Sequence, residues 1–160
     1  MTDRKVWVEN ISRATVTLMV PNCNFVRELR GEGSKTQIPY DILFEALSEP
    51  GVDVMFEEGF LYIPNKQDRI DLGIETEDDE VSVEEKVLSS DKILEILMSG
   101  NAVEVKEMLD KLAIEQKKKV AEVAVDNQIT NYGVATLIKQ ATGIDVIKRV
   151  QENISEKEDN

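Results

Sequence analysis

Alternation of apolar and polar residues near the N-terminus predicts β-strands. The segments KVWVENI (residues 5–11) and ATVTLMV (residues 14–20) place apolar side chains at every second position. A period of two is typical of a strand that buries one face. Only Ser12 and Arg13 separate the two segments, so we expect them to pair as a hairpin. A third strand is expected over residues 25–29.

The pattern then predicts one short helix. In QIPYDILFEALSEPG (residues 37–51), Pro39 suits the first turn of a helix and Pro50-Gly51 suits its end. The apolar stripe of this helix consists of Ile42, Leu43, Ala46 and Leu47. Residues 52–56 and 60–63 flank a Glu-Glu-Gly turn and are expected to form a closing hairpin. Residues 1–64 are therefore predicted to be a small β domain that carries one short helix.

Residues 65–89 have the composition of an acidic linker. The stretch IETEDDEVSVEE (residues 74–85) has seven acidic residues and no basic one, a composition that favours an unpacked chain. The spacing and the glycine of a calcium-binding loop are missing, so no metal site is expected here. Four apolar residues leave open that part of this segment docks on a neighbouring domain: Val81, Val83, Val87 and Leu88.

From residue 90 onward, apolar residues recur with the period of a helix. Ser90, Asn101 and Asn131 suit helix N-caps, while Gly100 and Gly143 suit helix ends. These signals predict a small all-α bundle of about five short helices over residues 90–154, followed by a charged tail over residues 155–160. The predicted fold class is α+β: an N-terminal β domain, an acidic linker and a C-terminal helical bundle.

Net charge, cysteine content and the lack of a long apolar run limit the partners and the location that we expect for the protein. The 160 residues include 32 Asp and Glu against 19 Lys and Arg, a net charge of −13 at pH 7. This excess repels the nucleic-acid backbone, so no nucleic-acid partner is expected, and residues 117–119, three lysines, are expected on a solvated helix face. The single Cys23 permits no internal disulfide, which fits synthesis in a reducing cytoplasm. No apolar run of about 18 residues occurs, so neither a membrane partner nor export is expected.

Few residues qualify as catalytic candidates. The chain has no histidine, which removes the usual general base of Ser and Cys hydrolases and the commonest ligand of transition metals. The carboxylates fall in tandem runs and not singly in apolar surroundings, where a raised pKa could serve acid–base chemistry. We therefore expect no catalytic residues and no enzymatic activity, with a carboxylate-based hydrolase as the remote alternative.

RGEGSKTQ (residues 30–37) contains the residue types of a phosphate-binding loop. In that motif Lys and Ser/Thr directly follow the second glycine at the start of a helix. Here Ser34 separates Gly33 from Lys35, and Pro39 disfavours helical geometry in the residue before it. The segment is predicted to be a hairpin turn between the strand that ends near Leu29 and a short strand over residues 35–38, with Gly31 or Gly33 at a positive φ. No cofactor is expected.

Two sets of motifs resemble small proteins encoded among the structural genes of tailed bacteriophages of Gram-positive hosts. In the first half these are VWVENISRATVTLMVP, IPYDILFEAL and PGVDVMFEEGFLYI. In the second half, VAEVAVDNQITNYGVATLIKQATGIDVIKRV is similar to a helix with an Ala-Val pair, an Asn or Asp cap, and a Thr-Gly before the last helix. The strongly acidic segment between them departs from those proteins. The resemblance implies a virion component, made in the host bacterial cytoplasm and located in the virion.

The resemblance and the strands together predict how such a protein would attach. We expect a minor or auxiliary (decoration) capsid protein whose β domain binds the major capsid protein or another virion protein. The expected contact residues are Val6, Trp7, Val8, Thr15, Thr17 and Met19. Burial of Trp7 in the core is the favoured alternative for that residue, and a homo-oligomer is left open. The alternative function is an acidic phage-encoded regulator or inhibitor that imitates nucleic acid toward a host protein.

Overall fold

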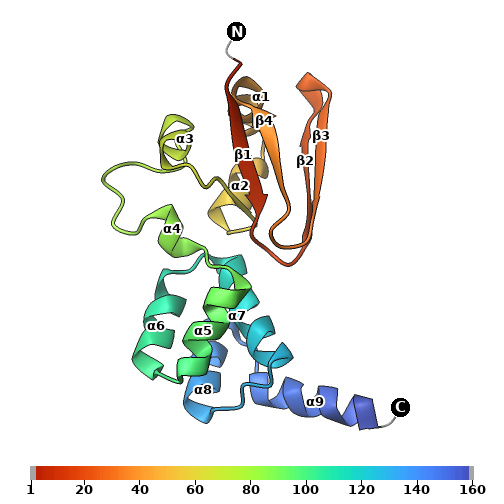
Figure 1. Cartoon of the computed structure of the whole chain (residues 1–160), viewed down its shortest axis with the longest axis vertical. Helices are drawn as coiled ribbons and strands as arrows, with labels where there is room; N and C mark the ends of the chain where they lie inside the picture. The colour runs from red at the N-terminus through yellow and green to blue at the C-terminus, as the bar shows by residue number, and fades with distance from the viewer. Residues whose placement is uncertain (1–2, 159–160) are drawn as a thin grey trace. The chain divides into compact units, whose positions relative to one another are not determined.

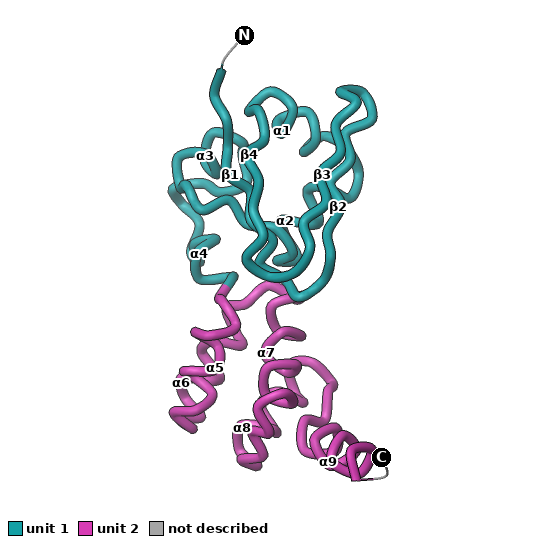
Figure 2. The backbone as a smooth tube through the Cα atoms, turned by 45° about the vertical axis from the view of Figure 1, so that its right-hand side comes forward, with its two compact units in different colours: residues 1–87 teal, residues 88–160 magenta. Residues whose placement is uncertain are grey.

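The computed structural model describes residues 3–158 and divides into two compact units, residues 1–87 and residues 88–160 (Figure 2). All strands of the described chain belong to unit 1, and unit 2 consists of helices, so the predicted α+β class is confirmed. None of the described helices is long and apolar enough to cross a membrane.

Unit 1 holds two antiparallel sheets. β1 (Lys5–Asn10) is the central strand of the first sheet, between β4 (Lys35–Pro39) and β5 (Leu61–Tyr62). β2 (Thr15–Val20) and β3 (Phe25–Arg30) form a separate two-stranded ribbon, joined by the 3-10 turn η1 (Pro21–Cys23). The strands over residues 5–11, 14–20 and 25–29 are confirmed, but the expected hairpin between the first two is wrong.

Asn10 explains why β1 and β2 do not pair. Its side chain is fully buried and donates to the carbonyls of Ala14 (2.7 Å) and Leu29 (3.0 Å). Its carboxamide oxygen accepts from the backbone N–H and the hydroxyl of Ser12 (2.9 and 2.8 Å). These four bonds satisfy the whole amide and fix the connection as a bend that leads from one sheet to the other.

The glycines of residues 30–37 form a turn, as predicted, and a strand follows it over residues 35–39. The expected hairpin is wrong, because β4 pairs with β1 while β3 pairs with β2. Gly31 and Gly33 have φ values of 78° and 90°, in the left-handed region that glycine adopts without steric cost. The N–H of Gly33 donates to the carbonyl of Asn10 (2.8 Å), and the Ser34 hydroxyl donates to the carbonyl of Gly31 (2.7 Å). Strand β4 follows this turn directly, so no helix N-terminus lies beside Lys35.

Four short helices complete unit 1: α1 (Tyr40–Ala46), α2 (Val52–Glu57), α3 (Lys66–Asp71) and α4 (Val83–Lys86). The helix after Pro39 is confirmed. The strand expected over residues 52–56 is wrong, because this segment is α2. Its buried residues, Val52 and Phe56, are four apart and so lie on one face of a helix. The expected closing hairpin is also wrong, since β5 pairs with β1.

The core of unit 1 lies between the strands and the helices α1 and α2, which Figure 1 shows behind the strands. Both sheets contribute to this core through alternate residues, and β3 contacts both β1 and β4. Core residues of the strands are Val6, Val8, Val16, Leu18, Val20, Phe25, Leu29 and Ile38. The opposite face of the strands therefore points outward.

The segment expected as an acidic linker, residues 65–89, is not one. It carries α3 and α4, and all of it up to Val87 belongs to unit 1. Leu72 and Val87 are buried, and Asn65 caps α3 by accepting from the N–H of Asp68 (3.0 Å). The acidic composition suggested an unpacked chain. Composition alone does not show that two of these carboxylates pair with a buried arginine, Arg69.

Unit 2 consists of α5 (Ser90–Ser99), α6 (Ala102–Lys111), α7 (Ile114–Asp126), α8 (Tyr132–Thr142) and α9 (Val146–Glu158). The predicted caps Asn101 and Asn131 accept N–H groups of α6 and α8, and Gly100 and Gly143 end α5 and α8 in the left-handed conformation. Two details differ from expectation. Ser89, not Ser90, caps α5, and residues 155–158 continue α9 instead of forming a tail.

Lys119 is a third departure in unit 2, because it was expected on a solvated face and is only 2 % exposed. Its ammonium group donates to the carbonyl of Leu88, while the Gln116 side chain accepts from the N–H of the same residue (3.1 Å). Two side chains of α7 thus hold the chain just before α5.

We expect Lys119→Met to destabilise unit 2 by about 1–3 kcal/mol, because it leaves the Leu88 carbonyl without this charged donor. The matched control is Lys118→Met at the neighbouring, exposed position, where we expect a change within about 0.5 kcal/mol. Urea denaturation followed by circular dichroism measures both. Equal effects at the two positions would contradict the role of Lys119.

Candidate functional site

The outward face of the strands in unit 1 is the candidate partner-binding surface, here called the outer strand face. It is formed by the exposed residues Lys5, Trp7, Lys35 and Gln37 on β1 and β4, and Thr15, Thr17, Met19, Val26, Glu28 and Arg30 on β2 and β3. Cross-strand register places Trp7 opposite Gln37, and Met19 opposite Val26. These side chains are held by strands whose other face is in the core.

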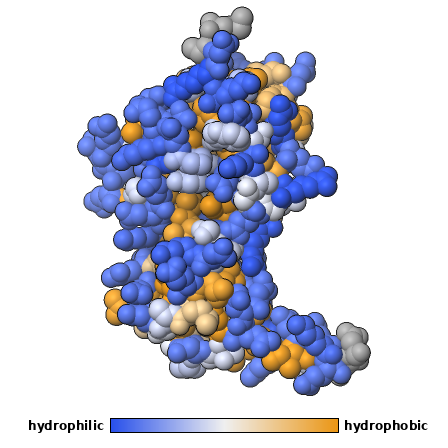
Figure 3. Space-filling view, viewed as in Figure 1, coloured by the Kyte–Doolittle hydropathy of each residue, from blue (hydrophilic) through white to orange (hydrophobic). Residues whose placement is uncertain are grey.

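Three large apolar side chains lie on this face. Trp7 is 47 % exposed, Met19 55 % and Val26 52 %. Figure 3 shows hydrophobic side chains among hydrophilic ones at the upper right of unit 1, over the end of the β2–β3 ribbon. Exposed aromatic and methionine side chains of this size are enriched at the centres of protein–protein interfaces.

The predicted contact residues divide into two groups. Trp7, Thr15, Thr17 and Met19 are exposed on the outer strand face. Val6 and Val8 are fully buried and pack in the core, so their assignment to a partner surface is wrong. Burial of Trp7 is also wrong, because the pleat that directs both valines inward directs the residue between them outward.

Of the two strands expected to provide backbone edges, residues 5–11 and 14–20, only the second has a free edge along its length. β1 pairs with β4 along its length and with β5 at Glu9 and Asn10, so it is not an edge strand. β2 pairs with β3 alone and leaves its other edge without a strand partner among the described residues. β2 is therefore the strand with predicted contact residues to which a partner could add a strand.

The outer strand face belongs to the basic part of an acidic protein. Residues 4–39 contain six Lys and Arg against three Glu, whereas residues 40–87 contain fifteen Asp and Glu against three Lys and Arg. On this face, Lys5 and Lys35 form no ion pair with a residue that the structure describes. The Lys35 ammonium lies 5.5 Å from the centroid of the Trp7 ring, within the range of a cation–π contact.

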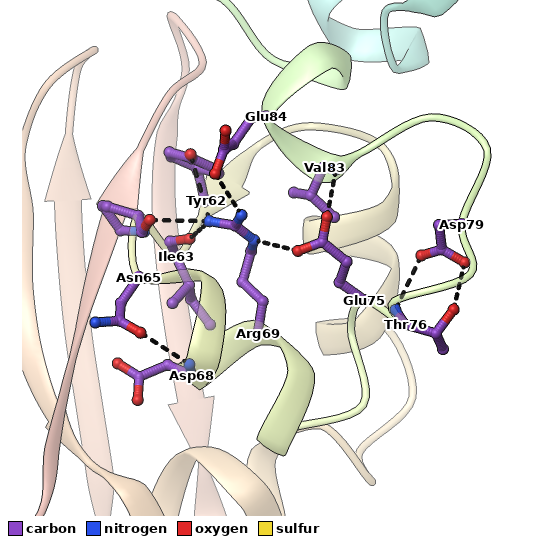
Figure 4. Close-up of polar contacts among 11 residues, drawn as sticks. Tyr62, Ile63, Asn65, Asp68, Arg69, Glu75, Thr76, Asp79, Val83 and Glu84 are labelled. Carbon is purple, nitrogen blue, oxygen red and sulfur yellow. Dashed lines mark hydrogen bonds and ion pairs between the residues drawn. The ribbon is translucent and has the colours of Figure 1, made fainter.

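A second concentration of polar chemistry surrounds Arg69 (Figure 4). The guanidinium is fully buried and donates through Nε to Glu75 (2.9 Å) and through Nη2 to Glu84 (2.8 Å). Nη1 donates to the carbonyls of Ile63 (2.8 Å) and Pro64 (2.9 Å). We call this set of contacts the Arg69 clamp.

The clamp keeps Glu75 and Arg69 ionised. Burial by itself raises the pKa of Glu75, but hydrogen bonds from the N–H of Val83 (3.0 Å) and from Arg69 outweigh it, and the pKa is lowered. Burial acts to lower the pKa of Arg69, and the bonds to Glu84 and Glu75 reverse this, so that its pKa is raised. A carboxylate held charged by an arginine is a structural contact and not a proton donor or acceptor at neutral pH.

Sequence reasoning missed Arg69 and therefore the fold of residues 64–87. The sequence did contain a signal. Arg69 is the only arginine between the Asn65 cap and residues 74–85, which include seven carboxylates. A buried arginine requires carboxylate partners, so a pairing between the two could have been expected.

Neither the search for a metal site nor the comparison with known proteins assigns a function to this chain. Among residues 3–158 no group of three or more His, Cys, Asp and Glu side chains is arranged to hold a metal ion. Comparison with protein-family models, curated proteins and solved structures finds no significant match to this chain. The outer strand face is therefore characterised by its own residues.

Proposed function

We propose that the chain is a non-enzymatic virion component of a tailed bacteriophage, an auxiliary capsid protein that attaches through the outer strand face of unit 1. The observation that carries the attachment is the exposure of Trp7, Met19 and Val26 on strands anchored in a core. The partner is the major capsid protein or another virion protein. The assignment to a virion rests on the motif resemblance described above.

The character of the face supports a protein partner. Strand pairing fixes the backbone that carries its apolar side chains, so binding does not have to order this part of the chain. Basic groups beside them, such as Lys5 and Lys35, favour a partner with an acidic rim. The exposed edge of β2 offers main-chain hydrogen bonds beside the Met19–Val26 pair.

The test is co-sedimentation of the full chain with particles of the phage that encodes it. We expect the double substitution Trp7→Ala with Met19→Ala to weaken binding by more than about tenfold, the effect of losing central interface residues. The matched control is Tyr132→Ala, which removes a 78 % exposed aromatic side chain from unit 2. Equal binding by the two variants, or absence of the chain from purified particles, would refute the proposal.

A second candidate is the acidic regulator that imitates nucleic acid. It is favoured by residues 40–65, which contain six carboxylates and no Lys or Arg. Binding by such a surface is screened by salt, whereas apolar contacts persist when the Debye length falls from about 10 Å to about 3 Å. Loss of particle binding between about 0.1 and 1 M salt would favour the regulator.

A further inference from the structure

The helical side of unit 1 carries a second exposed apolar centre. α1 and α2 cover one side of the core, and their outward residues include Phe44, 55 % exposed, and Val54, 39 % exposed. We call this surface the helix face; it is formed by Asp41, Phe44, Glu45, Asp53, Val54 and Glu57. The ring of Phe44 stacks on Tyr40 with centroids 6.2 Å apart, and Arg4 lies over the Tyr40 ring at 4.5 Å.

The charge of the helix face is opposite to that of the outer strand face. From residue 40 to residue 65 the chain has six Asp and Glu and no basic residue. The outer strand face, by contrast, carries Lys5, Arg30 and Lys35 against Glu28. Each face therefore has an apolar centre, and the charged groups around the two centres have opposite signs.

We propose that unit 1 associates head to tail, with the outer strand face of one copy on the helix face of a second copy. This goes beyond attachment to a particle, because it concerns the contact between copies of the chain. The two faces lie on opposite sides of one core, so they cannot meet within one molecule. Pairing of unlike faces is a heterologous contact, which builds rings or chains and not closed two-fold dimers.

Charge favours the head-to-tail contact between unlike faces over a symmetric contact between two identical faces. Two helix faces brought together would place at least four carboxylates of each copy against those of the other. Two outer strand faces would place Lys5 and Lys35 against the same groups of the second copy. Juxtaposed like charges disfavour both symmetric pairings, and the unlike pairing brings carboxylates to lysines and arginines.

The inference is tested by sedimentation velocity of the full chain and of two variants. One variant, Trp7→Ala with Met19→Ala, removes the centre of the outer strand face. The other, Phe44→Ala with Val54→Ala, removes the centre of the helix face. We expect each variant alone to self-associate at least about tenfold more weakly than the wild type.

An equimolar mixture of the two variants gives the decisive result. Each variant retains one intact face, and the two intact faces are complementary, so we expect the mixture to recover association but to stop at dimers. Val103→Ala, at a 66 % exposed position of α6, is the control and should leave association unchanged. Circular dichroism of each variant checks that the fold is retained.

Three outcomes would overturn the inference: a wild type that stays monomeric at high concentration, a mixture that stays monomeric, or a variant that self-associates like the wild type. Particle binding separates this inference from the proposed function. The helix-face variant should still co-sediment with particles, whereas the strand-face variant should lose both activities. If the strand-face variant loses only particle binding, the proposed function stands and the head-to-tail contact fails.

Discussion

Arg69→Met is expected to lower the free energy of unfolding of unit 1 by about 3–5 kcal/mol, the range for breaking a buried ion pair by removing one partner. The substitution keeps an unbranched side chain but removes every donor of the Arg69 clamp. Glu75, which is 3 % exposed, is then left as a buried carboxylate without its counter-ion. The carbonyls of Ile63 and Pro64 lose their donor as well.

Urea denaturation of unit 1 measures this effect, and limited proteolysis locates it. We expect cleavage between residues 75 and 85 to become faster in the variant, because the clamp holds this segment on the unit. The matched control is Arg30→Met, which breaks an exposed pair with Glu28 (3.1 Å) and should have little effect. If the two arginine variants unfolded alike, the clamp would not be what holds the acidic segment.

The stability of the protein at low pH provides a second test of the Arg69 clamp. The pKa of Glu75 is lower in the folded protein than its ordinary value, so the folded state binds fewer protons than the unfolded chain. This contribution to stability is present above the unfolded pKa of about 4.3 and is lost as the pH falls through the folded pKa. We expect the wild type to lose stability in this range more steeply than a Glu75→Gln variant.

Asn10→Leu is expected to destabilise unit 1 by more than about 3 kcal/mol, because several buried groups each lose a partner at about 1–3 kcal/mol. Leucine has nearly the shape of asparagine but can neither donate nor accept a hydrogen bond. The carbonyls of Ala14 and Leu29 and the N–H and hydroxyl of Ser12 would lose the partners that hold the bend.

The measurement is again urea denaturation, with Asn22→Leu as the matched control. Asn22 lies in the exposed turn η1, so its replacement should change stability by less than about 0.5 kcal/mol. A destabilisation by Asn10→Leu no larger than this control would show that the bend is set by another feature of the chain.

Local signals were sufficient for much of the fold. The strands over residues 5–11 and 14–20 follow from a period of two. The helices of unit 2 follow from a helical period bounded by Asn101, Asn131, Gly100 and Gly143, each of which forms the expected cap. Such signals are readable because an N-cap or a left-handed glycine acts on groups within a few residues of itself.

The candidate site was predictable only in part. The alternation of β1 separated Val6 and Val8 from Trp7, but it did not say which set faces the core. A large apolar residue such as Trp7 is normally assigned to the interior. Its exposure follows because α1 and α2 cover the side of the sheet to which the valines point.

By itself, then, the sequence determined the strands β1 to β4, the helix α1, the helical period of unit 2 and its caps, because these depend on neighbouring residues. Only the tertiary structure decided that β1 pairs with β4 and β5, that residues 52–57 are helical, and that the acidic segment is folded onto unit 1. The physical reason is distance along the chain. Asn10 bonds to Leu29, and Arg69 to Glu84, over separations of 19 and 15 residues, and no local pattern records which distant partner a buried polar group will find.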